Sequence, residues 1–317
     1  IHAHFLAKSF YEAIEAMPGV SERSDPYGRQ LVRDGKTIVP LNDAWMAPDH
    51  QLRDMDAKGF DVRLLSITTP NLYFFEAGDQ AEIAKRVNDE TIAFSAAHAD
   101  RFKTLASLPL GDVEGSLAEI DRVRDAPEVV GLAFGSNVGG VPLSDPRFEP
   151  VWARINELRM AVVEHPVHPS FNADLQDLNL SIGIGFYFDT QLMVTRMIMN
   201  GVFERFPDFP FVVAHTGAGM LGVINRLDSI AARHPDSKRA MKKSFIAYAQ
   251  GLYYDTCSFY VPMLMHAREF LGSGRLMFGT DYPFVDADTD YVDSLDMGAE
   301  EKKAIIGDTA AGIFGLQ

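Results

Sequence analysis

The sequence of 317 residues contains a single cysteine, Cys257, so no disulfide can form within the chain. So little cysteine fits a reducing compartment, and we expect the protein in the cytoplasm. No apolar run approaches the ~20 residues that cross a bilayer, and no signal-peptide pattern opens the sequence, so we expect no membrane partner. The sequence starts at Ile1 rather than at Met, and the start of the first strand is expected to lie before this numbering.

Positive charge is also scarce. Lys and Arg number 29 against 44 Asp and Glu, which gives a formal net charge of -15. Such a surface repels phosphate backbones, so nucleic acid is not an expected partner. A small anionic substrate is still compatible with it, because a bound metal ion or an arginine can outweigh the distant field.

Low-complexity stretches, charge blocks and repeats are absent. Short apolar runs instead alternate with longer amphipathic segments. The expected strands are Ile1–His4, Val62–Ile67, Phe102–Leu108, Val129–Phe134, Met160–Glu164, Phe211–Ala214, Leu252–Asp255 and Arg275–Phe278. The expected helices are Pro48–Lys58, Gln80–Ala99, Val113–Arg124, Arg147–Leu158, Thr190–Arg205, Gly219–Arg233, Val261–Leu271 and Ala299–Ile313. Asp189 is expected to cap the fifth of these helices.

This alternation predicts a parallel sheet. Eight units in a chain of this length favour one (β/α)8 TIM barrel domain over 1–317 rather than an open doubly wound sheet. No GxGxxG follows the first strand, which weakens the dinucleotide-binding alternative. Residues 6–44 break the alternation with a turn-rich stretch and two short possible strands, 30–32 and 37–39. We interpret them as a small rim insertion after the first strand that shapes a lid or a pocket wall.

Nine histidines divide into two groups. Those in or beside helical patterns are expected to be solvated helix residues; they are His50, His98, His234 and His266. Most of the others, with one aspartate, follow expected strands at their carboxyl ends: His2, His4, His165, His215 and Asp281. In a barrel those ends meet at one face.

His2 and His4 point to the same side of their strand because they are two residues apart. An HxH pair alone is a weak signal, and a lone strand-end histidine is more often a hydrogen-bonded rim residue than a ligand. His or Asp at the ends of four strands in barrel register is a much stronger signal. Three imidazoles and a carboxylate suit a borderline divalent ion such as Zn²⁺, which lowers the pKa of a bound water to about 7. His215 is then placed to take or give a proton.

Several motifs resemble the amidohydrolase superfamily, in the branch that holds 2-amino-3-carboxymuconate-6-semialdehyde decarboxylase and related nonoxidative decarboxylases. The resemblance covers nearly the whole chain. It rests on the segments 1–4 (IHAH), 53–59 (RDMDAKG), 164–166 (EHP), 197–207 (MIMNGVFERFP), 214–215 (AH) and 279–284 (GTDYPF).

Carried over by position, the resemblance implies that His2, His4, His165 and Asp281 ligate one divalent ion, Zn²⁺ first and Mn²⁺ as the alternative. It also implies that His215 and Asp281 are catalytic. Superfamily members with two metals carry a lysine at the end of the fourth strand, but residues 131–137 read GLAFGSN, which supports a single metal. The resorcylate and carboxyvanillate decarboxylases usually have Glu where His2 stands, so the chain looks closer to the carboxymuconate-semialdehyde type.

The chain also departs from that type. Relatives place a substrate-binding arginine shortly before a Trp that matches Trp45, whereas residues 36–44 contain none. A second such arginine, which relatives supply from a neighbouring subunit, matches Arg226, so a homodimer or higher oligomer is expected. The alternative interpretation of Arg226 is an ordinary arginine on a helix surface. The remaining candidates for substrate contact are Trp45, His168, Asn71, Tyr73 and Phe284.

Three functions stay open. The first is metal-dependent nonoxidative decarboxylation of an unsaturated or aromatic carboxylic acid. The second is metal-dependent hydrolysis or hydration of a lactone, an ester-like carbonyl or a conjugated acid, which the missing arginine favours slightly. The third is a barrel that only binds ligand, whose signature would be a lost metal ligand.

Overall fold

The structure is a computed structural model that describes residues 1–26 and 28–316. Its centre is an eight-stranded parallel sheet with the strand order β1-β5-β6-β7-β10-β11-β12-β13, in which every neighbour pairs in parallel. The strands are β1 (Ala3–His4), β5 (Arg63–Ser66), β6 (Phe102–Ser107), β7 (Val129–Gly135), β10 (Ala161–His165), β11 (Phe211–Val213), β12 (Tyr253–Asp255) and β13 (Leu276–Met277).

Hydrogen bonds close this sheet into a ring. The segment that follows β13 runs beside β1, with a parallel bridge between Ala3 and Tyr282. The backbone N–H of His4 donates to the carbonyl of Tyr282 at 2.8 Å, and that of Asp281 donates to the carbonyl of His2 at 2.8 Å. The expected (β/α)8 barrel is therefore confirmed, and each expected apolar run overlaps one of its strands; β7 and β10 each extend one residue beyond the expected run.

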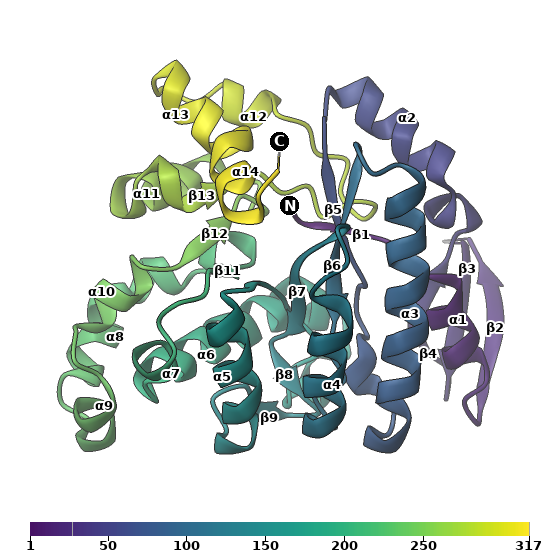
Figure 1. Cartoon of the computed structure of the whole chain (residues 1–317), viewed down its shortest axis with the longest axis horizontal. Coiled ribbons are helices and arrows are strands. Elements are labelled where there is room, and N and C mark those ends of the chain that lie inside the picture. The colour runs from purple at the N-terminus through teal and green to yellow at the C-terminus, as the bar shows by residue number, and fades with distance from the viewer. Residues whose placement is uncertain (27, 317) are drawn as a thin grey trace.

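Helices cover the outside of the ring, and Figure 1 shows α3, α4 and α5 side by side along it. The helices that precede β12 are α2 (Pro48–Lys58), α3 (Ala77–Ala97), α4 (Val113–Val123), α5 (Glu149–Leu158), α6 (Phe186–Met199), α7 (Val202–Arg205), α8 (Ile224–Ala231), α9 (Pro235–Ala240) and α10 (Phe245–Ala249). Those that follow it are α11 (Val261–Leu271), α12 (Asp290–Asp293), α13 (Ala299–Lys303) and α14 (Thr309–Phe314). A short hairpin, β8 (Asn137–Val138) with β9 (Val141–Pro142), extends the loop after β7.

Both faces of the strands are buried, which explains why they read as continuous apolar runs rather than alternating ones. One face fills the barrel interior with a cluster that includes Leu64, Val163 and Met277. The other face packs under the helices, where Phe134 of β7 lies against Trp152 of α5. Side chains two residues apart along a strand share a face, so the interior set also decides which residues emerge at the barrel mouth.

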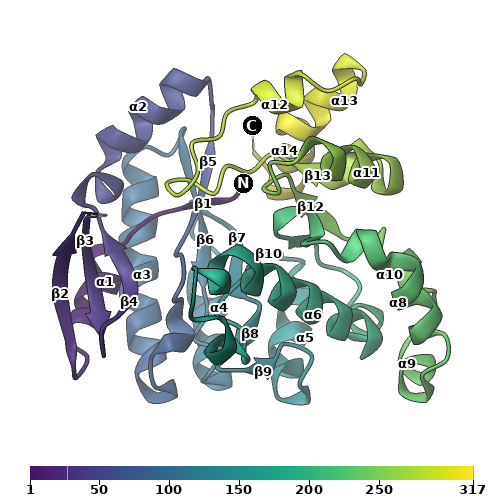
Figure 2. The ribbon, with the colours of Figure 1, turned by 180° about the vertical axis from the view of Figure 1, so that it is seen from behind.

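The stretch 6–44 has more structure than its sequence pattern predicted. It forms a helix and a three-stranded antiparallel sheet that lie at one side of the barrel, beside α3 (Figure 2): α1 (Lys8–Glu15), β2 (Val20–Asp25), β3 (Gly28–Arg33) and β4 (Lys36–Leu41). The two expected short strands lie inside β3 and β4, whereas α1 and β2 were missed. Helix α1 is only two turns long, and the carboxylate of Glu90 accepts hydrogen bonds from its first backbone N–H groups. The start of α1 is therefore stabilised by a residue that is distant in the sequence, and no local capping motif marks it.

Two boundaries around the fifth expected helix also differ. Helix α6 begins at Phe186, directly after a π-helical turn over Ser181–Gly185, so Asp189 is not its cap. The Asp189 carboxylate is buried and accepts hydrogen bonds from Ser136 and Asn137 instead. The helix then breaks before α7 at Gly201, where φ is 69° and a Cβ would lie 2.4 Å from the carbonyl oxygen of Ala240.

Within the part of the chain that the structure describes, no helix combines the length and apolar character needed to traverse a lipid bilayer.

Candidate metal centre

The four expected ligands lie in or close to three strands of the ring, β1, β10 and β13, of which only β1 and β13 are neighbours. His2 precedes β1 and His4 ends it, His165 ends β10, and Asp281 lies in the segment that follows β13. His165 emerges on the same face as Ala161 and Val163, which belong to the barrel interior. The barrel geometry therefore directs these side chains to one point at the mouth, as the strand-end pattern predicted.

Distances between their atoms show how closely they meet. Asp281 Oδ1 lies 3.4 Å from His2 Nε2, 3.2 Å from His4 Nε2 and 4.0 Å from His165 Nε2. One ligand atom from each of the four residues falls within 4.8 Å of all the others. The structure thus brings the four together, while their role as metal ligands stays a prediction.

The Nδ1 atom of each of the three imidazoles, which is the nitrogen that does not face Asp281, contacts a hydrogen-bonding group of the protein. His2 Nδ1 lies 2.6 Å from Asp255 Oδ2, His4 Nδ1 lies 3.3 Å from Ser66 Oγ, and His165 Nδ1 donates to the carbonyl of Pro166 at 2.8 Å. Histidines that bind metals are usually anchored in this way, because a proton held on one nitrogen leaves the lone pair of the other free for the ion.

Burial favours the protonation states that a cation requires. It lowers the pKa of His4 and holds that of His165 well below the usual range, with the neighbouring imidazoles adding to the effect on His165. Burial alone would raise the pKa of Asp281, but the neighbouring imidazoles of His2 and His4 hold it well below its usual range. His2 differs: burial lowers its pKa, yet Cys257, Asp255 and Asp281 together raise it well above 6.5.

These residues fit a divalent cation. His2 Nε2 is buried and has no hydrogen-bond partner among residues 1–26 and 28–316, an arrangement that costs free energy unless something binds there. Three imidazole nitrogens with one carboxylate form a donor set suited to zinc and related ions.

His215 stands beside this cluster on a turn with unusual backbone. His215, Thr216 and Ala218 all have φ between 50° and 55°, the left-handed region that residues other than glycine rarely adopt. The ring centroid of His215 lies 5.4 Å from that of His2 and 6.1 Å from that of His165. Its Nδ1 is buried without a partner in the described residues, and burial lowers its pKa to about 4. A neutral imidazole therefore faces the cluster without belonging to it.

Aromatic rings flank the centre on two sides. The ring of Phe284 lies 5.7 Å from that of His4, and the ring of Trp45 lies 5.6 Å from that of Phe284. On the side of His215, Tyr187 stacks on the imidazole at 5.0 Å with 27° between the planes. Phe284 is 42% exposed, which leaves a face available to a ligand. Two of the expected substrate residues, Trp45 and Phe284, thus lie at the mouth.

The other expected substrate residues have different environments. Asn71 is buried and its side chain accepts from the backbone N–H of Leu72 at 2.6 Å, so it caps a turn. Tyr73 packs on Gly135, where an added Cβ would lie 2.8 Å from its ring. His168 bonds Ser181 through Nδ1 at 2.8 Å.

Arg226 is not part of this cluster. It is exposed on α8, and within the described ranges it forms no hydrogen bond or ion pair with the residues of the centre. Its predicted contact with substrate would need a second subunit.

Three residues around the metal centre were not predicted from the sequence: Asp255, Ser66 and Tyr187. Asp255 was included only as the last residue of an expected strand, although that position is where the other site residues were found. Ser66 and Tyr187 carry no comparable signal, because a strand serine and a tyrosine near a helix start are common.

His50 is a helix residue as expected, but it is half-buried rather than fully solvated. Its Nδ1 lies 2.6 Å from the hydroxyl of Tyr282, the residue after Asp281. The periodicity of a helix shows which side it buries, but it cannot show that a loop from the far end of the chain covers that side.

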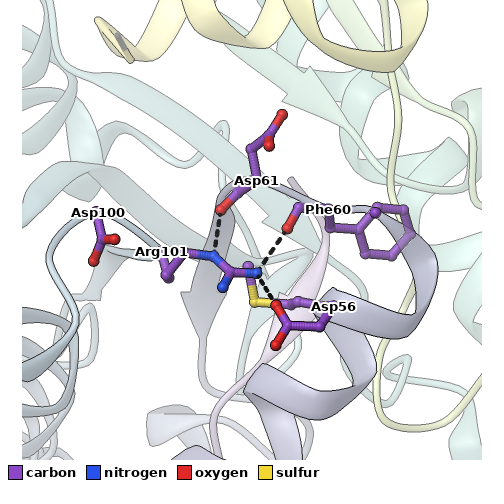
Figure 3. Close-up of a pocket in the computed structure, with 7 residues that line it drawn as sticks. Asp56, Phe60, Asp61, Asp100 and Arg101 are labelled. Carbon is purple, nitrogen blue, oxygen red and sulfur yellow. Dashed lines mark hydrogen bonds and ion pairs between the residues drawn. The ribbon is translucent and has the colours of Figure 1, made fainter.

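A separate hollow of about 460 Å³ lies away from the metal centre, at the amino-terminal ends of β5 and β6 (Figure 3). Arg101 lines this hollow. Its guanidinium donates hydrogen bonds to Asp56 at 2.8 Å and to the carbonyls of Phe60 and Asp61 at 3.0 Å. Those contacts tie two loops together, so the guanidinium has a structural task. Catalytic sites in barrels lie at the opposite end, which is where the histidines meet.

A family model described as "Amidohydrolase" matches residues 1–316. The chain belongs to the amidohydrolase family. This family assignment confirms the resemblance inferred from the sequence motifs.

Relatives and solved structures agree with the assignment. The chain is 27% identical to a 2-amino-3-carboxymuconate-6-semialdehyde decarboxylase of Dictyostelium discoideum, over 80% of this chain and 72% of that protein. It is 28% identical to a gamma-resorcylate decarboxylase of Rhizobium radiobacter, over 89% and 93%. The crystal structure of 5-carboxyvanillate decarboxylase from Sphingomonas paucimobilis superposes with a TM-score of 0.82 at 26% identity, over 88% and 87%.

The 5-carboxyvanillate decarboxylase of Novosphingobium aromaticivorans was solved as a complex with manganese and 4-hydroxy-3-methoxy-5-nitrobenzoic acid. It is similar to this chain with a TM-score of 0.77 at 24% identity, over 84% of this chain and 79% of that one.

Proposed function

We propose that this amidohydrolase is a metal-dependent nonoxidative decarboxylase of a planar carboxylic acid, aromatic or conjugated. The observation that carries the proposal is the meeting of three imidazole Nε2 atoms with Asp281 Oδ1 at a barrel mouth flanked by aromatic rings. The relatives named as decarboxylases support the reaction class, since both curated proteins remove a carboxyl group from an unsaturated or aromatic acid.

His2, His4, His165 and Asp281 are the proposed ligands of a single divalent ion. When bound, such an ion supplies positive charge that can hold the substrate carboxylate and stabilise the electron-rich state left as CO₂ departs. The donor set favours Zn²⁺, and the manganese in a related structure supports Mn²⁺ as the alternative to test.

His215 is the proposed acid–base residue. Decarboxylation breaks the bond between the ring or chain carbon and the carboxyl carbon, leaves the electron pair on the former, and requires a proton there. Because burial keeps the His215 imidazole neutral near pH 7, it can accept a proton from the solvent and pass it to that carbon. Its stacking on Tyr187 restrains the plane of the ring.

The aromatic side chains are proposed to orient the substrate. Phe284, supported by Trp45, stands on the side of His4, and Tyr187 stands on the side of His215. A flat substrate between these walls would stack on at least one of them. Asn71 and His168 are kept as outer contacts, since each already has a hydrogen-bond partner. Tyr73, whose ring packs on Gly135, is kept with them.

A homo-oligomer is the proposed assembly. Arg226 shares one face of its helix region with Val223 and Ile230, both of which are 39% exposed. Exposed apolar side chains around a cation suit a surface that is covered by a second copy. That arrangement would let Arg226 approach the neighbour's mouth and bind a substrate carboxylate.

The test is the measurement of CO₂ release by zinc-loaded, manganese-loaded and metal-stripped protein from a panel of hydroxybenzoates and muconate semialdehydes. CO₂ should appear only with metal, and the released product should carry a proton at the former carboxyl position. Metal-dependent turnover without CO₂ would instead establish the hydrolase or hydratase alternative, for which lactones and esters complete the panel.

A further inference from the structure

Asp255 is a buried carboxylate whose two oxygens have different tasks. Oδ2 lies 2.6 Å from His2 Nδ1. Oδ1 accepts hydrogen bonds from the backbone N–H of Thr216 at 3.1 Å and from that of Cys257 at 2.9 Å. Two backbone N–H groups can only donate, so they fix which oxygen they face and leave Oδ2 for the imidazole.

These contacts join two parts of the proposed site. Through Oδ2 the carboxylate holds the ring whose other nitrogen faces Asp281. Through Oδ1 it holds the residue after His215, inside the left-handed turn. His2 also packs closely against Gly279 and Cys257. A Cβ added to Gly279 would lie 2.8 Å from the Cβ of His2 and 2.7 Å from Cys257 Sγ, so the His2 side chain has little room to move.

We propose that Asp255 is a positioning residue that keeps a proton on His2 Nδ1, so that the Nε2 lone pair points to the proposed cation, and that the same carboxylate fixes the turn carrying His215. The inference rests on the proposed role of His2 as a metal ligand. It predicts that metal binding depends on a side chain that does not touch the metal.

Asp255→Asn separates this role from simple packing. The amide oxygen is retained by the N–H groups of Thr216 and Cys257, so the amide nitrogen must face His2 Nδ1. Both groups would then donate toward each other unless the His2 proton moves to Nε2, where it would occupy the lone pair that the ion needs. The turn of His215 keeps its acceptor, whereas the metal site loses the correct tautomer.

Glu164→Gln is the matched control. Glu164 is also buried and accepts from the hydroxyl of Thr190 at 2.6 Å and from the backbone N–H of Ala214, on the other side of His215, at 3.1 Å. A glutamine can accept from Ala214 with its oxygen and donate to the Thr190 hydroxyl, which can reverse its role. The same acid-to-amide change should therefore be tolerated here.

The experiment measures the Zn²⁺ affinity of the metal-stripped full chain and both variants by competition with a chromophoric chelator. Asp255→Asn should weaken Zn²⁺ binding by roughly 10- to 100-fold, the usual effect of removing a partner behind a metal-binding histidine. Glu164→Gln should stay near the wild type. Equal affinity in Asp255→Asn and the wild type would overturn the inference alone, whereas a wild type that takes up no Zn²⁺ would overturn the proposed metal site as well.

A second readout needs only the wild type, in case the variant does not fold. In zinc-loaded protein labelled with ¹⁵N at histidine, NMR should show a downfield, slowly exchanging proton on His2 Nδ1, as expected for a short bond to a carboxylate. A zinc-loaded His2 that carries no proton on Nδ1 would refute the positioning role.

Discussion

Replacing His215 by alanine should separate proton transfer from metal binding. The imidazole is near the cluster, but Asp281 and the three other histidines supply the atoms that lie within 4.8 Å of one another. His215→Ala should therefore keep metal at the wild-type level and lose turnover. General acid–base catalysis contributes about 10²- to 10⁴-fold, which corresponds to an increase of about 3–5 kcal/mol in the activation barrier.

The stability cost of this substitution should be small. The variant loses the stacking with Tyr187, worth about 0.5–1.5 kcal/mol, but it also removes a buried Nδ1 without a partner in the described chain, which relieves a cost of about 1–3 kcal/mol. Alanine at φ 53° adds strain that asparagine tolerates better. His215→Asn is therefore a companion variant that keeps the turn, and it should be as inactive as His215→Ala.

The assay combines metal analysis of each purified variant with initial rates of CO₂ release at saturating substrate. His234→Ala, which changes an exposed histidine remote from the mouth, controls for the loss of an imidazole as such. Loss of metal from His215→Ala equal to that of a ligand variant would refute the division of roles. So would turnover within a few-fold of the wild type.

Further substitutions and treatments test other parts of the site. Asp281→Ala should lose both metal and turnover, measured by the same two assays; retention of a full equivalent of metal would argue against its role as a ligand. Stripping the metal should lower the Tm in a calorimetric scan by ~5 °C or more, because an ion at a hundredfold excess over its Kd contributes about 2.7 kcal/mol; an unchanged Tm would contradict the site. Asp54→Asn should destabilise the fold by about 3 kcal/mol in urea, because Asp54 pairs with the guanidinium of Arg63, which is only 4% exposed. Burial alone would raise the pKa of Asp54, but hydrogen bonds from Lys58 and Arg63 hold it below its usual value, so its contribution is full above about pH 4 and disappears as the pH falls through the lowered pKa. The stability gap between wild type and variant should accordingly close in acid, and a gap that widened would show the sign to be wrong.

The sequence predicted the barrel because its strands are buried on both faces and so appear as separate apolar runs. It predicted the meeting of His2, His4, His165 and Asp281 for a related reason, since parallel strands in a ring bring their carboxyl ends to one mouth. Neither inference needed knowledge of side-chain contacts.

Other features depend on contacts between distant segments. The first N–H groups of α1 are capped by Glu90, which lies about eighty residues further along the chain. Asp255 and His50 matter through partners near the opposite end of the sequence, His2 and Tyr282. Asp189 resembles a helix cap in its local sequence, but its carboxylate instead accepts hydrogen bonds from Ser136 and Asn137. Periodicity and capping signals act over a few residues, so they cannot foresee such partners.

Metal analysis of the purified protein, alongside His165→Ala, tests the site most directly. The wild type should carry one equivalent of Zn²⁺ or Mn²⁺ per chain, and His165→Ala should carry far less under the same conditions. A wild type with no bound divalent ion, and none taken up from added Zn²⁺ or Mn²⁺, would contradict the metal centre and the decarboxylase that depends on it.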